Sequence, residues 1–108
     1  TMSPVAPTLQ GFFTERLVKH RHVSPRTITS YRDSLKLLFQ FVEQQTGKLP
    51  ATLDWNDLDV DTIAAFLEHL ETTRGNNPRT RNLRLTAIRS LFAYAALSEA
   101  SDNAAYLQ

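Results

Sequence analysis

Two pairs of residues, Ser24-Pro25 and Asn77-Pro78, most constrain how this chain can fold. A serine or asparagine side chain accepts a hydrogen bond from a free amide at a helix start. Proline suits the first helical position, where no amide hydrogen is needed. Each pair therefore predicts the start of a helix. Gly47, followed by Pro50, predicts the end of the first of these two helices.

Apolar residues recur with a helical period in four segments, and no segment alternates as a strand does. We expect helices from Pro7 or Thr8 to about His20, from Pro25 to Gly47, from a cap at Asp59 to Arg74, and from Pro78 to about Leu97, with residues 98–108 forming a short final turn or helix. Their apolar faces are Leu9, Phe12, Phe13 and Leu17; Ile28, Tyr31, Leu35, Leu38, Phe39 and Val42; Ile63, Phe66, Leu67 and Leu70; and Leu85, Ile88, Leu91, Phe92 and Ala95. The predicted fold is all-α, a compact orthogonal bundle of four to five helices.

The 108 residues suit a single domain, 1–108, and we expect residues 1–7 to be flexible or derived from a tag. The chain has no cysteine, which excludes disulfides and thiolate metal sites. No apolar run could span a bilayer, and the first residues lack the pattern of a signal peptide. We therefore expect a cytoplasmic protein with no membrane partner, metal, cofactor or small-molecule substrate.

Charge is distributed unevenly along the chain. Residues 16–36 contain six basic residues and one acid, residues 43–71 contain one basic residue and seven acids, and residues 74–89 contain five arginines and no acid. Two basic segments therefore flank an acidic one, which indicates one side that faces a polyanion. The acids near Asp57 lack the spacing of a calcium loop, and helix capping with loop solvation explains them more simply.

Residues 24–35 read SPRTITSYRDSL, and residues 78–92 read PRTRNLRLTAIRSLF. The first resembles the S-x-x-T-x-x-x-Y-x-x-x-L opening of the second helix in core-binding domains of tyrosine recombinases of the phage-integrase type, and the second resembles their fourth helix. The resemblance covers residues 9–97. It implies a SAM-like N-terminal domain that binds double-stranded DNA and takes part in DNA integration and recombination.

In that family the nucleophilic tyrosine lies in a separate C-terminal domain, to which nothing in this sequence corresponds. The resemblance therefore implies a chain that is not an enzyme by itself, with no catalytic residues. Tyr31, Tyr94 and Tyr106 are poor candidates for a nucleophile. The implied partners are duplex DNA, the catalytic domain of the same parent chain, and other recombinase subunits on the DNA.

The resemblance also implies that the second and fourth helices contact DNA, and the charge distribution independently selects the same two segments. Leu83 stands where many family members carry a polar or basic residue, and Arg16, Lys19 and Arg21 could simply complement the dipole of the first helix. Solvated arginines without a ligand are the simpler reading of any one basic segment. The candidate DNA-binding residues are Arg26, Thr27, Ser30, Arg32, Arg79, Thr80, Arg81, Asn82, Arg84 and Arg89.

The alternative function is a helical protein-protein interaction module. The acidic third helix, with Glu68 and Glu71, could provide such a surface. Salt discriminates the two functions, because DNA binding weakens strongly with salt, whereas an apolar groove responds little.

Overall fold

In the computed structural model the described backbone covers residues 4–20 and 23–107, and the described side chains cover residues 4–17 and 23–98. The elements, in chain order, are α1 (Val5–Gly11), η1 (Phe12–His20), α2 (Pro25–Thr46), the short 3-10 turns η2 (Pro50–Thr52) and η3 (Trp55–Leu58), α3 (Val60–Thr72) and α4 (Pro78–Leu107).

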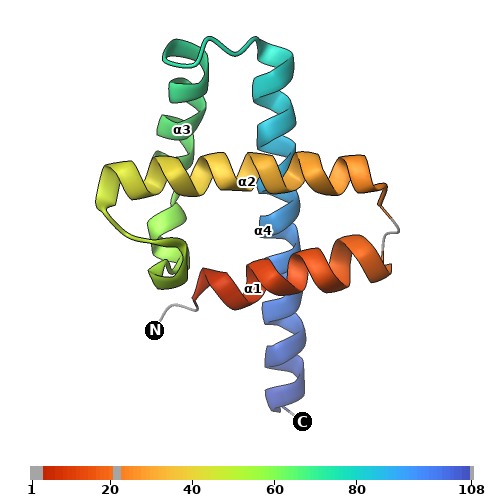
Figure 1. Cartoon of the computed structure of the whole chain (residues 1–108). Coiled ribbons are helices and arrows are strands. Elements are labelled where there is room, and N and C mark those ends of the chain that lie inside the picture. The colour runs from red at the N-terminus through yellow and green to blue at the C-terminus, as the bar shows by residue number, and fades with distance from the viewer. Residues whose placement is uncertain (1–3, 21–22, 108) are drawn as a thin grey trace.

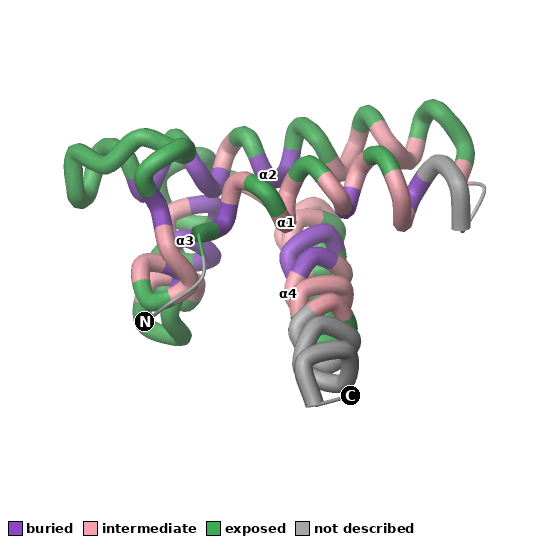
Figure 2. Tube along the Cα trace, turned by 90° about the horizontal axis from the view of Figure 1, so that it is seen from below, coloured by how far each residue is buried: buried purple, intermediate pink, exposed green. Residues whose placement is uncertain are grey.

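The helices form two crossed layers. Helix α1 with its continuation η1 lies beside α2 in one layer, and α3 and α4 run across them in the other (Figure 1). Seen from below, α3 and α4 descend from the layer of α1 and α2 (Figure 2). The expected all-α orthogonal bundle is confirmed for the described residues.

The capping residues act as the sequence predicts. The Ser24 hydroxyl accepts a hydrogen bond from the amide of Thr27 at 3.2 Å, and Pro25 is the first residue of α2. The side chains of Asp59 and Asn77 cap α3 and α4 in the same way. Gly47 ends α2 with a φ of 77°, a left-handed conformation that glycine adopts without steric cost.

The first helix begins earlier than expected. Instead of starting near Pro7 or Thr8, α1 begins at Val5, whose side chain is buried and whose amide donates to the carbonyl of Leu53 at 3.0 Å. Residues 5–7 are thus part of α1, and residues 1–3 of the segment expected to be flexible or derived from a tag lie outside the described part. A contact between distant segments fixes this start, and no local pattern indicates it.

The second half of the first helix is wider than an α-helix. Residues 12–20 form a π-helix, in which positions five apart lie on one face. Phe12 and Leu17 have this spacing and are both buried, whereas Leu9 and Phe13 are half-buried. The wider turn thus brings two large side chains into the core.

The fourth helix does not stop near Leu97. It continues as one helix to Leu107, so the predicted separate turn over residues 98–108 is wrong as far as Leu107. After Pro78 the chain contains neither glycine nor proline, so nothing strongly interrupts the helix.

One hydrophobic core joins all four long helices. It combines Phe12 and Leu17 of η1, five buried residues of α2, the inner face of α3, and Ile88 and Leu91 of α4. The loop between α2 and α3 adds Leu53 and Leu58, which the sequence analysis missed because short 3-10 turns carry no helical period. None of the described helices is long and apolar enough to cross a membrane.

Candidate nucleic-acid interface

Helices α2 and α4 meet at a polar contact inside their crossing. Ser34 of α2 is completely buried, and its hydroxyl donates to the carbonyl of Ser30 at 2.8 Å. The same hydroxyl accepts a hydrogen bond from Nη1 of Arg84 at 3.0 Å. This pair holds the two candidate helices together at a fixed position. Ser34 was not among the candidate residues named from the sequence. It lies on the apolar stripe of its helix, where a buried serine hydroxyl needs a hydrogen-bond partner.

Two of the candidate arginines therefore have structural partners. Arg84 is half-buried, and its Nε has no hydrogen-bond partner among the described residues. Arg81 is also half-buried, with Nε 2.9 Å from a carboxylate oxygen of Glu71 and Nη1 donating to the side chain of Asn82 at 3.2 Å. These two arginines tie α4 to α2 and α3, so neither is a freely exposed side chain.

At the start of α2, the candidate residues differ in exposure. Arg26 is exposed, whereas Thr27 and Ser30 are half-buried. The Thr27 hydroxyl accepts a hydrogen bond from the hydroxyl of Ser24 at 3.0 Å, so it forms part of the helix cap. The first turns of α2 thus present one free cation and two partly covered hydroxyls.

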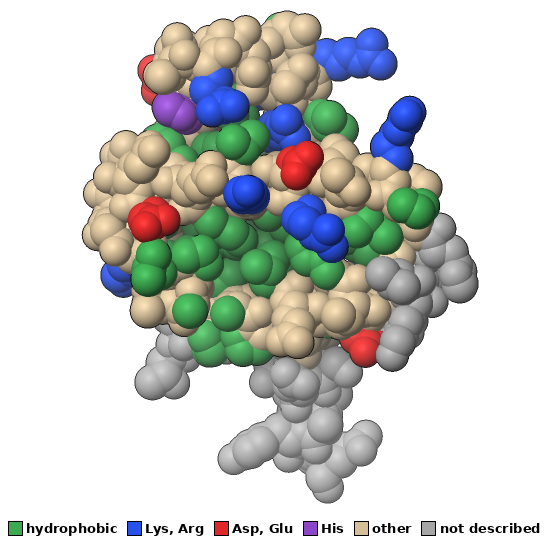
Figure 3. All heavy atoms as spheres, in the orientation of Figure 1, with side chains coloured by type: hydrophobic (Ala, Val, Ile, Leu, Met, Phe, Trp, Pro, Cys, Tyr) green, Lys and Arg blue, Asp and Glu red, His purple; other side chains and the backbone are tan. Residues whose placement is uncertain are grey.

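Arg32 lies away from the crossing. Its guanidinium carbon is 5.7 Å from the ring centroid of Phe13 in η1, the range of a cation–π contact. It is therefore on the side of α2 that faces α1, and the structure does not bring it together with the arginines of α4. Figure 3 shows basic side chains spread over α2 and beside the N-terminal part of α4, with apolar side chains gathered between α2 and α1.

The exposed side of α4 forms a stripe. Arg79, Asn82, Leu83 and Thr86 are exposed and follow the spacing of one helix face, while Thr80 is half-buried and its amide donates to the cap residue Asn77. Arg89 is also exposed, and it lines a pocket farther along the helix. Leu83 has 46% of its surface exposed, which makes it an apolar residue within a polar stripe.

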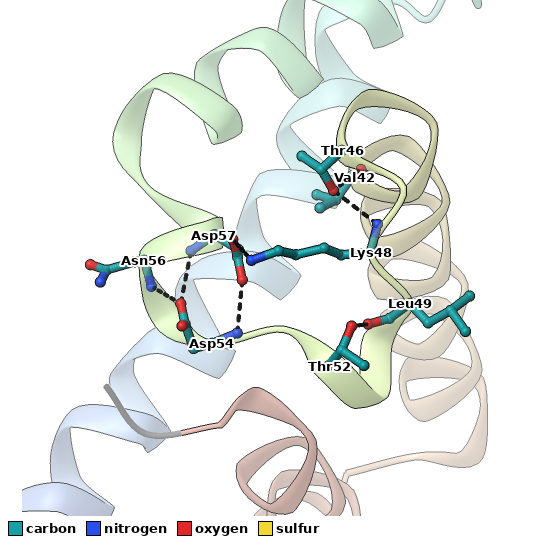
Figure 4. Close-up of polar contacts among 8 residues, drawn as sticks. All are labelled: Val42, Thr46, Lys48, Leu49, Thr52, Asp54, Asn56 and Asp57. Atoms are coloured by element: carbon teal, nitrogen blue, oxygen red, sulfur yellow. Dashed lines mark hydrogen bonds and ion pairs between the residues drawn. The ribbon is translucent and has the colours of Figure 1, made fainter. Parts of the chain in front are cut away.

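In the acidic segment, the carboxylates accept hydrogen bonds from nearby backbone amides. In the loop before α3, the Asp54 carboxylate accepts from the amides of Asn56 and Asp57, and Asp57 accepts from the amide of Asp54 (Figure 4). Lys48 Nζ pairs with Asp57 at 2.9 Å. The backbone hydrogen bond from Asp54, and then the bond from Lys48, lower the pKa of Asp57, and the same pair raises the pKa of Lys48.

These carboxylates serve helix capping. Among the described residues, no three His, Cys, Asp or Glu side chains lie close enough to hold a metal ion.

Comparison of the sequence with known families identifies the family of this chain. The family described as phage integrase, N-terminal SAM-like domain, matches residues 11–99. The chain belongs to this family. The match confirms the resemblance found over residues 9–97. No solved structure matches the domain significantly.

Curated relatives of this SAM-like domain are much longer proteins. The putative integrase/recombinase y4rC of Sinorhizobium fredii is 45% identical over 104 residues, which cover 96% of this chain and 31% of that protein. The tyrosine recombinase XerC of Chlorobaculum parvum is 31% identical over 84 residues, which cover 76% of this chain and 24% of that protein. The domain thus spans about a third or less of the relatives it matches.

Proposed function

We propose that this SAM-like domain binds duplex DNA as the part of a tyrosine recombinase that holds the site without cutting it. The contact surface consists of the first turns of α2 and the first three turns of α4. The exposed stripe of Arg79, Asn82 and Leu83 carries this proposal, because it presents a cation and an amide on α4, the helix that Ser34 holds against α2.

Each group has a separate role in this proposal. Arg26 and Arg79 are exposed and contact phosphates, and Thr80 adds a position near the positive end of the α4 dipole. Asn82 has the amide geometry that recognises adenine in the major groove. Arg81 and Arg84 add positive potential while they fix the helix, and Thr27 and Ser30 lie at the edge of the surface. Arg32 contributes to the basic charge from the far side of α2.

The chemistry of recombination belongs elsewhere in the parent protein. We infer that the parent breaks and rejoins DNA, because relatives are named integrase or tyrosine recombinase and extend far beyond this domain. The domain contributes DNA binding to this reaction. Its partners are DNA, the catalytic domain and neighbouring recombinase subunits. Its location is cytoplasmic.

The protein-interaction alternative rests on the acidic face. Glu71 is paired with Arg81, and the carboxylates at the start of α3 cap that helix, so part of this face is committed to the fold. No described feature of α3 identifies a protein of different sequence as its partner. We therefore favour DNA binding by the basic surface of α2 and α4.

The test is a titration of a fluorescent mixed-sequence duplex at several salt concentrations. The matched variants are Arg79→Ala and Lys36→Ala, because both side chains are exposed and each change removes one positive charge. Lys36 follows Ser34 by two positions, so it lies on the opposite side of α2. We expect Arg79→Ala to weaken binding and to reduce the log–log salt slope by about 0.9, the value for one phosphate, and Lys36→Ala to change both much less.

The outcome separates the two functions. If five phosphates are neutralised, the wild-type slope is about −4.5. Equal effects of the two variants would mean that the charge of the domain, and not this surface, attracts DNA. Binding that does not respond to salt, or no binding by the folded chain, would contradict the proposal.

A further inference from the structure

A pocket of about 540 Å³ lies between η1, the first half of α2 and the middle of α4. Phe12, Leu17 and Val23 give it an apolar floor, and Arg16 and Arg89 stand in its wall. No acid lines the pocket, and neither arginine has a hydrogen bond or ion pair among the described residues. Two unpaired cations around an apolar floor favour a ligand that carries both negative charge and an apolar group.

The same chain presents a segment of this kind at the first turn of α3. Val60 is 83% exposed, the most exposed of the large apolar residues in the described part. Asp59 and Asp61 flank it, and both are exposed. The carboxylate of Asp59 accepts a hydrogen bond from the amide of Thr62 at 2.8 Å, which fixes the turn. That backbone bond also lowers the pKa of Asp59, so its carboxylate stays charged at neutral pH.

The segment and the pocket lie on opposite sides of the molecule. Helix α3 is on one side of α4, and the first turns of α2 are on the other (Figure 1). One copy therefore cannot fill its own pocket, whereas a second copy can approach it.

We propose that the first turn of α3 in one copy docks into this pocket of a second copy. Val60 packs on the apolar floor, and the carboxylates of Asp59 and Asp61 face Arg16 and Arg89. Because two different surfaces meet, the contact is heterologous and repeats head to tail, as a ring or a row of copies. This goes beyond DNA binding, and it assigns Arg89 to the contact between subunits.

The contact buries little more than one helical turn, so it is weak between free chains. It becomes strong where DNA holds copies side by side, because their effective concentration rises. This second statement rests on the proposed function, whereas the contact itself does not.

The absence of cysteine allows a direct test by disulfide formation. One preparation carries Val60→Cys, and a second carries Ala93→Cys at an exposed position that lines the pocket. The two are mixed at high protein concentration and low salt without DNA, oxidised mildly, and separated on a non-reducing gel. The control mixture replaces Ala93→Cys by Gln40→Cys, an exposed position outside the pocket.

We expect the first mixture to form much more of the mixed dimer than the control mixture. Adding Arg16→Glu and Arg89→Glu to the Ala93→Cys chain should reduce the dimer to the control level. Adding Asp61→Arg to the Val60→Cys chain should then restore it. Asp59 stays unchanged because it caps α3, and circular dichroism verifies that every variant is folded.

Equal disulfide formation in the two mixtures would overturn the proposal, as would a charge-reversed pocket that still forms the dimer. The duplex titration, repeated with Arg89→Gln, separates this failure from failure of DNA binding. If the disulfide does not form and Arg89→Gln weakens DNA binding as much as Arg79→Ala, the pocket binds a DNA phosphate. The docking proposal would then be wrong and the proposed function would stand.

Discussion

At the scale of single residues, Ser34 explains why one of the candidate arginines, Arg84, is not free to contact a ligand. A completely buried hydroxyl needs a partner, and Ser34 has two, the carbonyl of Ser30 and the guanidinium of Arg84. Arg84 precedes Ile88 by four residues and Leu91 by seven, so it shares a helix face with these two buried residues. Its partner comes from a helix fifty residues away in the sequence, so only the packed structure reveals it.

Ser34→Ala tests this structural role. The change leaves Nη1 of Arg84 without its buried partner, so we expect the free energy of unfolding to fall by about 1–2 kcal/mol, measured by urea denaturation. Gln40→Ala, at an exposed position of the same helix, should change it by less than about 0.5 kcal/mol. A loss of stability for Ser34→Ala no larger than that of Gln40→Ala would show that the pair contributes little.

Leu83 permits a gain of function. It is 46% exposed on the stripe of α4 that we propose for DNA, four residues after Arg79. Leu83→Arg should tighten duplex binding and make the salt slope steeper by about 0.9, because it adds one phosphate contact. Leu97→Arg, at another exposed leucine of the same helix, adds the same charge far from the proposed surface. Equal gains for both variants would contradict the placement of DNA on the first turns of α4.

At the scale of the elements, the starts of α2, α3 and α4 could be predicted because their signals are local. A capping side chain and the amide it satisfies lie within three residues, so Ser24, Asp59 and Asn77 identify their helices without any tertiary information. The start of α1 depends on Leu53, and the π-helical widening depends on packing of Phe12. Neither has a local signature, and the sequence analysis missed both.

The loop before α3 predicts a loss of stability in acid. The folded chain holds the pKa of Asp57 and Asp59 below their ordinary value of 3.8 through backbone hydrogen bonds. Their contribution is present above that value and is lost as the pH falls through the lower folded-state pKa. The unfolding free energy should therefore decrease below about pH 4, as denaturant titrations at several pH values would measure.

Asp57→Asn isolates one of these groups. It should lower stability at neutral pH, because the ion pair with Lys48 is lost, and make the decrease in acid smaller. An unchanged decrease would show that other carboxyls cause the acid sensitivity.

At the scale of the whole molecule, the distribution of charge, rather than any single side chain, supports the proposed function. The two basic segments become parts of crossing helices, and the acidic segment occupies the loop and α3 on another side. Arg26 and Arg79 are exposed cations, and counting charge along the chain could not foresee that Arg81 and Glu71 pair across two helices. Arg16, which by sequence could simply complement the dipole of the first helix, lines a pocket together with Arg89.

The central claim is that DNA lies against the first turns of α2 and α4. The most direct measurement is the change in backbone amide NMR signals when an unlabelled duplex is added to the ¹⁵N-labelled chain. We predict the largest changes in residues 25–34 and 78–87, with little change in residues 54–71. Changes concentrated in the acidic segment, or spread evenly over the chain, would contradict the account.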